Sequence, residues 1–191
     1  PFYFCEINKP EFYVEDLIGE DELCFIATSS LMFRNADFRQ HPEPAWTFKS
    51  TSGDIPRNIL FAKRGPLGYL NDVMSVYRKN RGGASFVDND RKAAFLFNRI
   101  DMYSDINEEL DYVYDEQLKK NIARYYYMLL DSNEYRDQYW AKLPYAVKYL
   151  RLGKPSGARI KEVVRDHILP PFLQQLYSFI AISLYKIRSK K

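Results

Sequence analysis

The sequence is poor in the residues that build cross-linked, fibrous or disordered proteins. Its 191 residues include only two cysteines, Cys5 and Cys24, with 8 glycines and 10 prolines. Two cysteines without close paired spacing form neither a disulfide framework nor a cysteine-based zinc site. The low glycine and proline content excludes fibrous and disordered classes. We therefore expect a packed, intracellular protein, cytoplasmic or nuclear, without metal or cofactor.

The sequence also lacks a long hydrophobic run. Its most apolar stretch, residues 172–187, is shorter than the roughly 20 residues that a bilayer requires and includes Gln174, Gln175 and Lys186. We expect a helix in the core and no membrane span. No basic segment is followed by an apolar run, so we expect no signal peptide.

Aromatic residues are abundant, with 16 Tyr, 13 Phe and 2 Trp, and 46% of the chain is apolar. This length and composition predict one domain, residues 1–191, with one sizeable core. Because a buried phenol needs a hydrogen-bond partner, many tyrosines are expected to be half-buried with the hydroxyl at the surface. Such surfaces suit contact with another macromolecule, although the composition of an AT-rich genome produces the same enrichment.

The pattern of residues predicts a mainly α or α+β fold. Residues 1–65 are expected to form an irregular, β-containing part, with a long irregular connection over 34–57 and a short strand over 59–62. Residues 66–191 are expected to form a bundle of about five to seven helices, beginning with one over 70–77.

Several helical boundaries and faces are predicted by local signals. Asp88 or Asp90 is a candidate cap of the helix that contains Ile100, and Ser156 is a candidate cap near the C-terminal end. Gly153 is expected to stop the preceding helix. An apolar stripe is expected along one further helix, at Leu118, Ile122, Tyr125, Tyr126, Leu129 and Leu130.

Charge is distributed in blocks although the net charge is only +3. Residues 1–30 and 101–145 are acidic, with net charges of −6 and −5, whereas residues 31–100 and 146–191 carry +6 and +8. A fold that joins the basic blocks creates a strong positive field. The alternative is that basic blocks lie against acidic ones within the molecule.

Clusters of Lys and Arg are the main candidate binding residues. At Lys63 and Arg64, before Gly65, a strand-to-helix joint would let free backbone amides bind an anion. In the later cluster, cations flank a Gly-Lys-Pro-Ser-Gly turn, and Tyr145 and Tyr149 are nearby candidates for stacking on bases. The candidate phosphate-binding residues are Lys63, Arg64, Arg78, Lys79, Arg81, Lys148, Arg151, Lys154, Arg159, Lys161 and Arg165.

One short pattern suggests catalysis. Arg34-Asn35 is followed by His41, and this spacing resembles the R-x(4–6)-H motif of the HEPN ribonucleases. The resemblance covers eight residues and implies metal-independent RNA cleavage across a dimer, in which Arg34 stabilises charge and His41 transfers a proton. The motif normally opens a helix, whereas His41 runs into Pro42 here. The other histidine, His167, follows a helical segment, where the helix dipole would favour an imidazolium.

These patterns favour a non-enzymatic module that binds the backbone of RNA or DNA. The first alternative is a protein interaction subunit of a larger assembly, with an acidic partner on the same cations. The second is the HEPN-like ribonuclease with Arg34 and His41.

Overall fold

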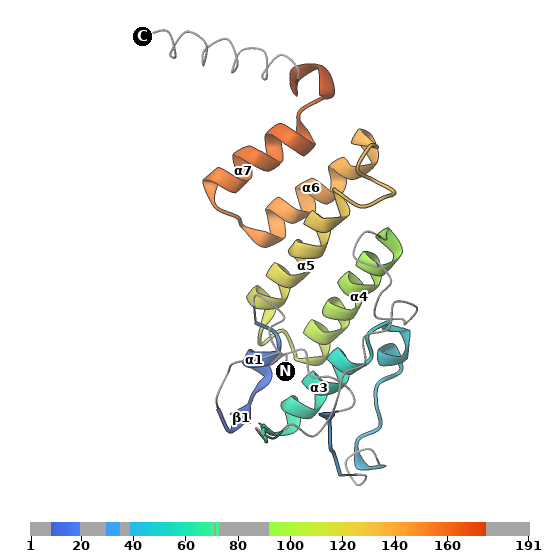
Figure 1. Cartoon of the computed structure of the whole chain (residues 1–191), viewed down its shortest axis with the longest axis vertical. Coiled ribbons are helices and arrows are strands. Elements are labelled where there is room, and N and C mark those ends of the chain that lie inside the picture. The colour runs from blue at the N-terminus through green and yellow to red at the C-terminus, as the bar shows by residue number, and fades with distance from the viewer. Residues whose placement is uncertain (1–8, 20–29, 35–38, 71, 73–91, 175–191) are drawn as a thin grey trace.

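The computed structural model describes residues 9–19, 30–34, 39–70, 72 and 92–174. Within them the chain is mostly helical, with one small antiparallel sheet near the N-terminus. This confirms the predicted fold class. Figure 1 shows the helices arranged along a long axis, with α1 and α3 towards one end and α7 towards the other.

Two long antiparallel helices form the centre, α4 (Ala93–Glu109) and α5 (Asp115–Leu129). The predicted apolar stripe on α5 is confirmed, because all of its members except the half-buried Tyr126 are buried. Leu96, Ile100 and Tyr103 recur on one face of α4 at helical spacing and are buried in the same core. The rings of Tyr103 and Tyr125 stack with their centroids 5.9 Å apart.

The first turn of α4 is capped from a distant part of the chain. Glu134 accepts a hydrogen bond from the backbone N–H of Ala93, at 3.0 Å. Lys92 precedes the helix and makes no side-chain cap. A carboxylate at this position also interacts favourably with the helix dipole. The predicted caps Asp88 and Asp90 lie outside the described residues.

The N-terminal elements pack against one end of the central pair. The helices α1 (Val14–Leu17) and α3 (Asp54–Arg64) contribute Val14, Leu17 and Ile59 to the core. The 3-10 helix η2 (Ala45–Lys49) packs on α4. The strands β1 (Glu11–Phe12) and β2 (Leu67–Gly68) pair antiparallel, with Glu11 opposite Gly68 and Phe12 opposite Leu67.

The prediction of a strand over residues 59–62 is wrong, because these residues belong to α3. An apolar run of four residues does not distinguish a strand from a buried helix turn. Asp54 in the first turn and Lys63 and Arg64 in the last turn complement the helix dipole and favour the helix. The irregular connection is accordingly shorter than predicted, since it contains η2 and ends where α3 begins.

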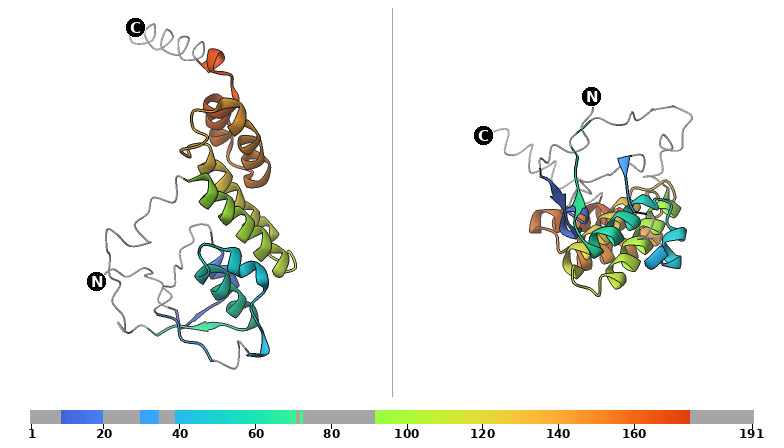
Figure 2. Two further views of the ribbon diagram at one scale, coloured as in Figure 1. Left: turned by 90° about the vertical axis from the view of Figure 1, so that its right-hand side faces the viewer. Right: turned by 90° about the horizontal axis from the view of Figure 1, so that it is seen from below.

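The C-terminal helices extend the molecule beyond the central pair. These are α6 (Tyr139–Gly153), α7 (Gly157–Val163) and the π-helical segment η5 (Val164–Ile168). They pack on α5 around a second core of Leu130, Ala146 and Val163. Figure 2 shows that α6 and α7 lie at the opposite end from α3.

Several predicted features fall partly or wholly outside the described residues. These include the helix over 70–77, of which only residues 70 and 72 are described, and the helix over 172–187 beyond Gln174. Phe172 is 69% exposed, so the described start of the latter helix is not buried as predicted. Within the described ranges, no helix is long and apolar enough to span a bilayer.

Candidate nucleic-acid interface

The turn between α6 and α7 presents a lysine in an unusual backbone conformation. Lys154 follows the last residue of α6 and adopts φ 44° and ψ 52°, in the left-handed region. The prediction that Gly153 stops this helix is confirmed, since α6 ends at Gly153 and Lys154 makes the turn. Left-handed backbone costs a non-glycine residue about 1–2 kcal/mol. A lysine at such a position is a candidate functional residue.

Gly153 also has a packing role. A Cβ atom built on this residue would lie 3.0 Å from Cβ of Ala123 on α5 and 3.4 Å from the ring of Tyr149. The absence of a side chain thus lets the C-terminal end of α6 approach α5 closely. This contact places the Lys154 turn against the middle of α5.

The predicted cap of α7 is confirmed. The Ser156 hydroxyl accepts a hydrogen bond from the backbone N–H of Arg159, at 3.4 Å. The Arg159 guanidinium lies 2.6 Å from the Glu162 carboxylate and 4.3 Å from the centroid of the Tyr127 ring. The hydrogen bond to Glu162 raises the pKa of Arg159, and one to Tyr149 adds to it. Arg159 thus connects α7 to α5 as well as contributing positive charge.

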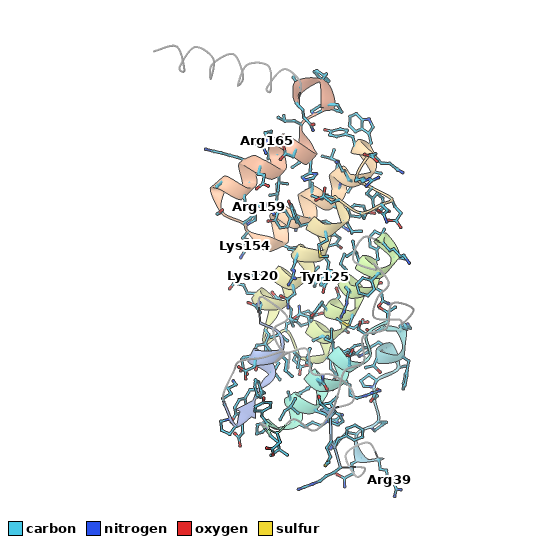
Figure 3. All side chains as sticks on the ribbon, in the orientation of Figure 1. Arg39, Lys120, Tyr125, Lys154, Arg159 and Arg165 are labelled. Carbon is cyan, nitrogen blue, oxygen red and sulfur yellow. The ribbon has the colours of Figure 1, made fainter. Side chains whose placement is uncertain are left out.

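Cations from four parts of the chain lie along one side of the molecule in the view of Figure 3. Figure 3 shows Lys120 on α5, Lys154 in the turn, Arg159 on α7 and Arg165 on η5 in one row. We refer to these four residues as the cation row. Arg165 forms two hydrogen bonds with its neighbour Asp166, at 2.5 and 2.6 Å. Sequence reasoning missed Lys120, because only the packing of α5 against α6 and α7 brings it beside the turn.

The surrounding segment has a strong excess of positive charge. Residues 139–174 include seven Lys or Arg and two acidic residues. Arg151, Lys154 and Lys161 are exposed. Lys148 lies 5.0 Å from the centroid of the Tyr126 ring and donates to its hydroxyl at 3.4 Å. Most of the predicted C-terminal cations thus reach solvent, and two of them also contact aromatic rings.

The two tyrosines predicted to stack on bases are half-buried and contact other aromatic rings. Tyr145 stacks on Tyr126 at 6.1 Å, and its hydroxyl donates to that of Tyr135. This hydrogen bond, with burial, raises the pKa of Tyr145 to about 12. Tyr149 contacts the Tyr127 ring at 5.0 Å. Both residues are on the side of α6 that faces α5, so their ring faces are occupied.

The face of α6 turned away from α5 carries a different aromatic residue. Trp140 is 77% exposed. Its ring lies edge-on to that of Tyr139, with centroids 4.8 Å apart and planes at 77°. Residue spacing alone does not show which aromatic residues of a helix are buried.

Two other predicted phosphate-binding residues, Lys63 and Arg64, lie on α3 (Figure 1) and are not part of this row. Lys63 and Arg64 lie at the C-terminal end of α3, so the predicted anion site at a helix start is wrong. Lys63 is paired with Glu109 at 3.0 Å, and Arg64 donates to the His41 carbonyl at 3.4 Å. A helix C-terminus presents carbonyl groups, which repel anions. Arg78, Lys79 and Arg81 lie outside the described residues.

The two residues of the ribonuclease motif are both exposed. His41 lies at a bend directly after a helical Arg39-Gln40 pair, so the chain leaves the helix at the histidine. Figure 3 shows Arg39 at the end of the molecule away from the cation row. The intervening residues 35–38 lie outside the described residues, and catalysis by Arg34 and His41 stays a prediction.

His167 has a structural environment. Its side chain is 8% exposed and lies edge-on to the Tyr127 ring, and its Nδ1 atom has no hydrogen-bond partner. Burial and the nearby Lys142 lower the pKa of His167. This favours a neutral ring over the imidazolium expected from the helix dipole.

Within the described ranges, no group of three or more His, Cys, Asp or Glu side chains is arranged to hold a metal ion. The cation row is therefore the candidate site with the most support. Comparisons with protein families, curated proteins and solved structures found no match to this chain.

Proposed function

We propose that this chain binds the backbone of nucleic acid along the cation row. The observation that carries the proposal is the convergence of Lys120, Lys154, Arg159 and Arg165 on one side of the molecule. Lys and Arg side chains that neutralise phosphates provide most of the affinity in such complexes. Lys154 supports the proposal further, because the chain tolerates backbone strain to place a cation at the turn.

The charged residues in and near the row favour binding to nucleic acids of many base sequences. The predicted recognition is by charge, and phosphate contacts position a protein without reading bases. In the cation row, Arg159 is paired with Glu162 and Arg165 with Asp166. We therefore expect most of the binding charge to come from Lys154 in the row and from the exposed Arg151 and Lys161, which lie near it in the sequence.

Binding is tested by titrating labelled RNA and DNA oligonucleotides at several salt concentrations and following fluorescence anisotropy. Replacing Arg151, Lys154 and Lys161 together with Ala should weaken binding to all sequences. Each lost phosphate contact should reduce the slope of log affinity against log salt by about 0.7–0.9. The Arg159 side chain is left intact because it also packs on Tyr127.

The matched control removes three exposed cations at the other end of the molecule, with Arg39, Lys49 and Arg64 replaced by Ala. We expect this control to keep most of the affinity. Equal losses in both variants would contradict a localised site, and no binding by the wild-type chain at tens of micromolar would overturn the proposal.

A second candidate function, a protein interaction subunit, is favoured by a different surface. Asp111 and Tyr112, in the turn between α4 and α5, have φ values of 52° and 59°. The turn leaves Tyr112 and Val113 well exposed. Beside it is a cavity of about 280 Å³ lined by residues that include Tyr13, Glu15, Val113 and Tyr114. Two consecutive strained residues beside exposed apolar groups suit a docking site.

This second function is tested by light scattering and by pull-down with Tyr112 and Val113 replaced by Ser. If the wild-type chain forms an oligomer or captures a partner protein, loss of that complex in this variant, with nucleic-acid binding unchanged, would support the assembly function. A complex that persists would exclude this surface.

A further inference from the structure

The outer face of α6 combines an exposed indole with cations. Trp140, Pro144, Val147 and Arg151 are spaced at i, i+4, i+7 and i+11, so they share one face of the helix. All four are exposed, including Val147 at 51%. Ala146, on the opposite side, is fully buried. We refer to these four residues as the α6 outer face. Lys148 borders this face, with its ammonium group against the Tyr126 ring of α5.

The indole is held in a defined place on this face. The Tyr139 ring supports its edge, and the Tyr139 hydroxyl donates a hydrogen bond to the Ile168 carbonyl of η5. This bond ties the start of α6 to the end of η5. The ring of Trp140 is therefore supported by packed structure while most of its surface is open to solvent.

The indole and the cations are spread along the length of α6. Trp140 and Arg151 are eleven residues apart, which corresponds to about 16 Å along a helix. Lys148 lies between them and is exposed. Lys154 comes three residues after Arg151 and lies in the cation row between Lys120 and Arg159 (Figure 3). The C-terminal end of the α6 outer face thus lies close to the cation row (Figure 3).

We propose that the α6 outer face selects single-stranded nucleic acid, with an unpaired base stacked on Trp140 and the adjoining phosphates beside Lys148 and Arg151. This inference rests on the proposed function. Stacking on an aromatic ring is available to any unpaired base and requires no sequence. A base in a duplex has both faces covered by neighbours, so an exposed indole discriminates against duplex.

The test uses Trp140 as its own reporter. The chain has two tryptophans, and Trp46 is half-buried against the core. In the variant Trp46→Phe, Trp140 is the single indole. Titration with a U12 oligonucleotide should quench its fluorescence, and the quenching should saturate at the same concentration as the anisotropy signal. A 12-base-pair RNA duplex that carries the same end label should produce little quenching of the Trp140 fluorescence.

The variant Trp140→Ala should weaken U12 binding by about 5- to 100-fold, the range found for loss of one stacked base. Duplex affinity should change by less than about twofold, since charge alone holds the duplex. Trp140→Phe should restore part of the U12 affinity because a ring remains. Phe48→Ala is the matched control, since it removes an exposed aromatic ring from η2, outside this face, and it should leave both affinities nearly unchanged.

Two results would overturn the inference while leaving the proposed function in place. One is equal loss of single-strand and duplex affinity in Trp140→Ala, and the other is unchanged U12 binding without quenching. Conversion of a dimer to a monomer by Trp140→Ala, with no selective loss of U12 binding, would assign this face to protein contact. Failure of the wild-type chain to bind either probe would overturn the proposed function itself.

Discussion

Replacing Lys154 with Gly should make the protein more stable and a weaker ligand of nucleic acid. Lys154 has φ 44° and ψ 52°, and relief of left-handed strain in a non-glycine residue is worth about 1–2 kcal/mol. Glycine offsets part of this gain, because it adds roughly 0.5–1 kcal/mol of conformational entropy to the unfolded chain. The net expectation is a gain of about 0.5–1 kcal/mol.

The electrostatic contribution of Lys154 to folding is small. Its nearest described effect is on Asp115, whose pKa is held below its ordinary value mainly by hydrogen bonds from Lys119 and Asn107, with a minor contribution from Lys154. The Lys154 side chain is exposed, so solvent screens this attraction. The conformational effect therefore decides the sign of the stability change.

The stability change is measured by urea denaturation. With an m-value of roughly 2 kcal/mol/M, a gain of about 0.5–1 kcal/mol raises the midpoint by about 0.25–0.5 M. Lys154→Asn is the matched control, because Asn tolerates left-handed backbone and also removes the charge. Both variants should lose the same nucleic-acid affinity, and the salt slope should fall by about 0.7–0.9 in each.

Two outcomes would refute the reasoning. A midpoint below that of the wild-type protein would show that Lys154 makes a stabilising contact that outweighs the strain. A stabilised variant that binds RNA with unchanged affinity and salt slope would show that the strained cation has no part in binding.

Three further predictions concern packing and titration. Gly153→Ala should destabilise the protein by about 1–3 kcal/mol through overpacking against Ala123. Gly157→Ala should be neutral or stabilising, because no atom lies within 4 Å of the added Cβ. Thermal denaturation compares the two variants, and a Gly153→Ala protein more stable than the wild type would contradict the close contact. Burial lowers the pKa of His167 in the folded state, so the unfolded state binds a proton at higher pH; the contribution of His167 to stability should be full above pH ~6.5 and should decline as the pH falls towards the pKa of the folded state. His167→Phe should reduce this decline, measured by urea denaturation at pH 5 and pH 7. An identical decline in the variant would assign the pH dependence to other groups. Glu134→Ala should cost about 1 kcal/mol by removing the cap of α4, measured by the urea midpoint, and no change would show that water replaces the cap.

Local signals predicted the features that depend on neighbouring residues. The stripe on α5 follows from the spacing of Leu118, Ile122 and Tyr125, and an α-helix places such residues on one face whatever its surroundings. The Ser156 cap was predictable because a serine oxygen satisfies an amide of its own first turn.

Local signals failed where a short segment was compatible with two structures. The run over residues 59–62 fits a strand or a helix, and packing of α3 against α1 and α4 selects the helix. At Gly153 the residue type predicted the end of the helix but not the packing role of the glycine. Its role is to let α6 approach α5, which depends on Ala123, thirty positions earlier in the chain.

The sequence by itself determined the mainly helical fold class, the apolar face of α5, the cap of α7 and the cationic character of the C-terminal segment. Only the tertiary structure decided which cations share one side and which aromatic rings remain open. Lys120 joins Lys154 because α6 and α7 pack on α5, and Tyr145 is half-buried against other rings whereas Trp140 is left exposed. Periodicity specifies the relative faces of one helix, whereas the partner that covers a face is set by contacts between distant segments.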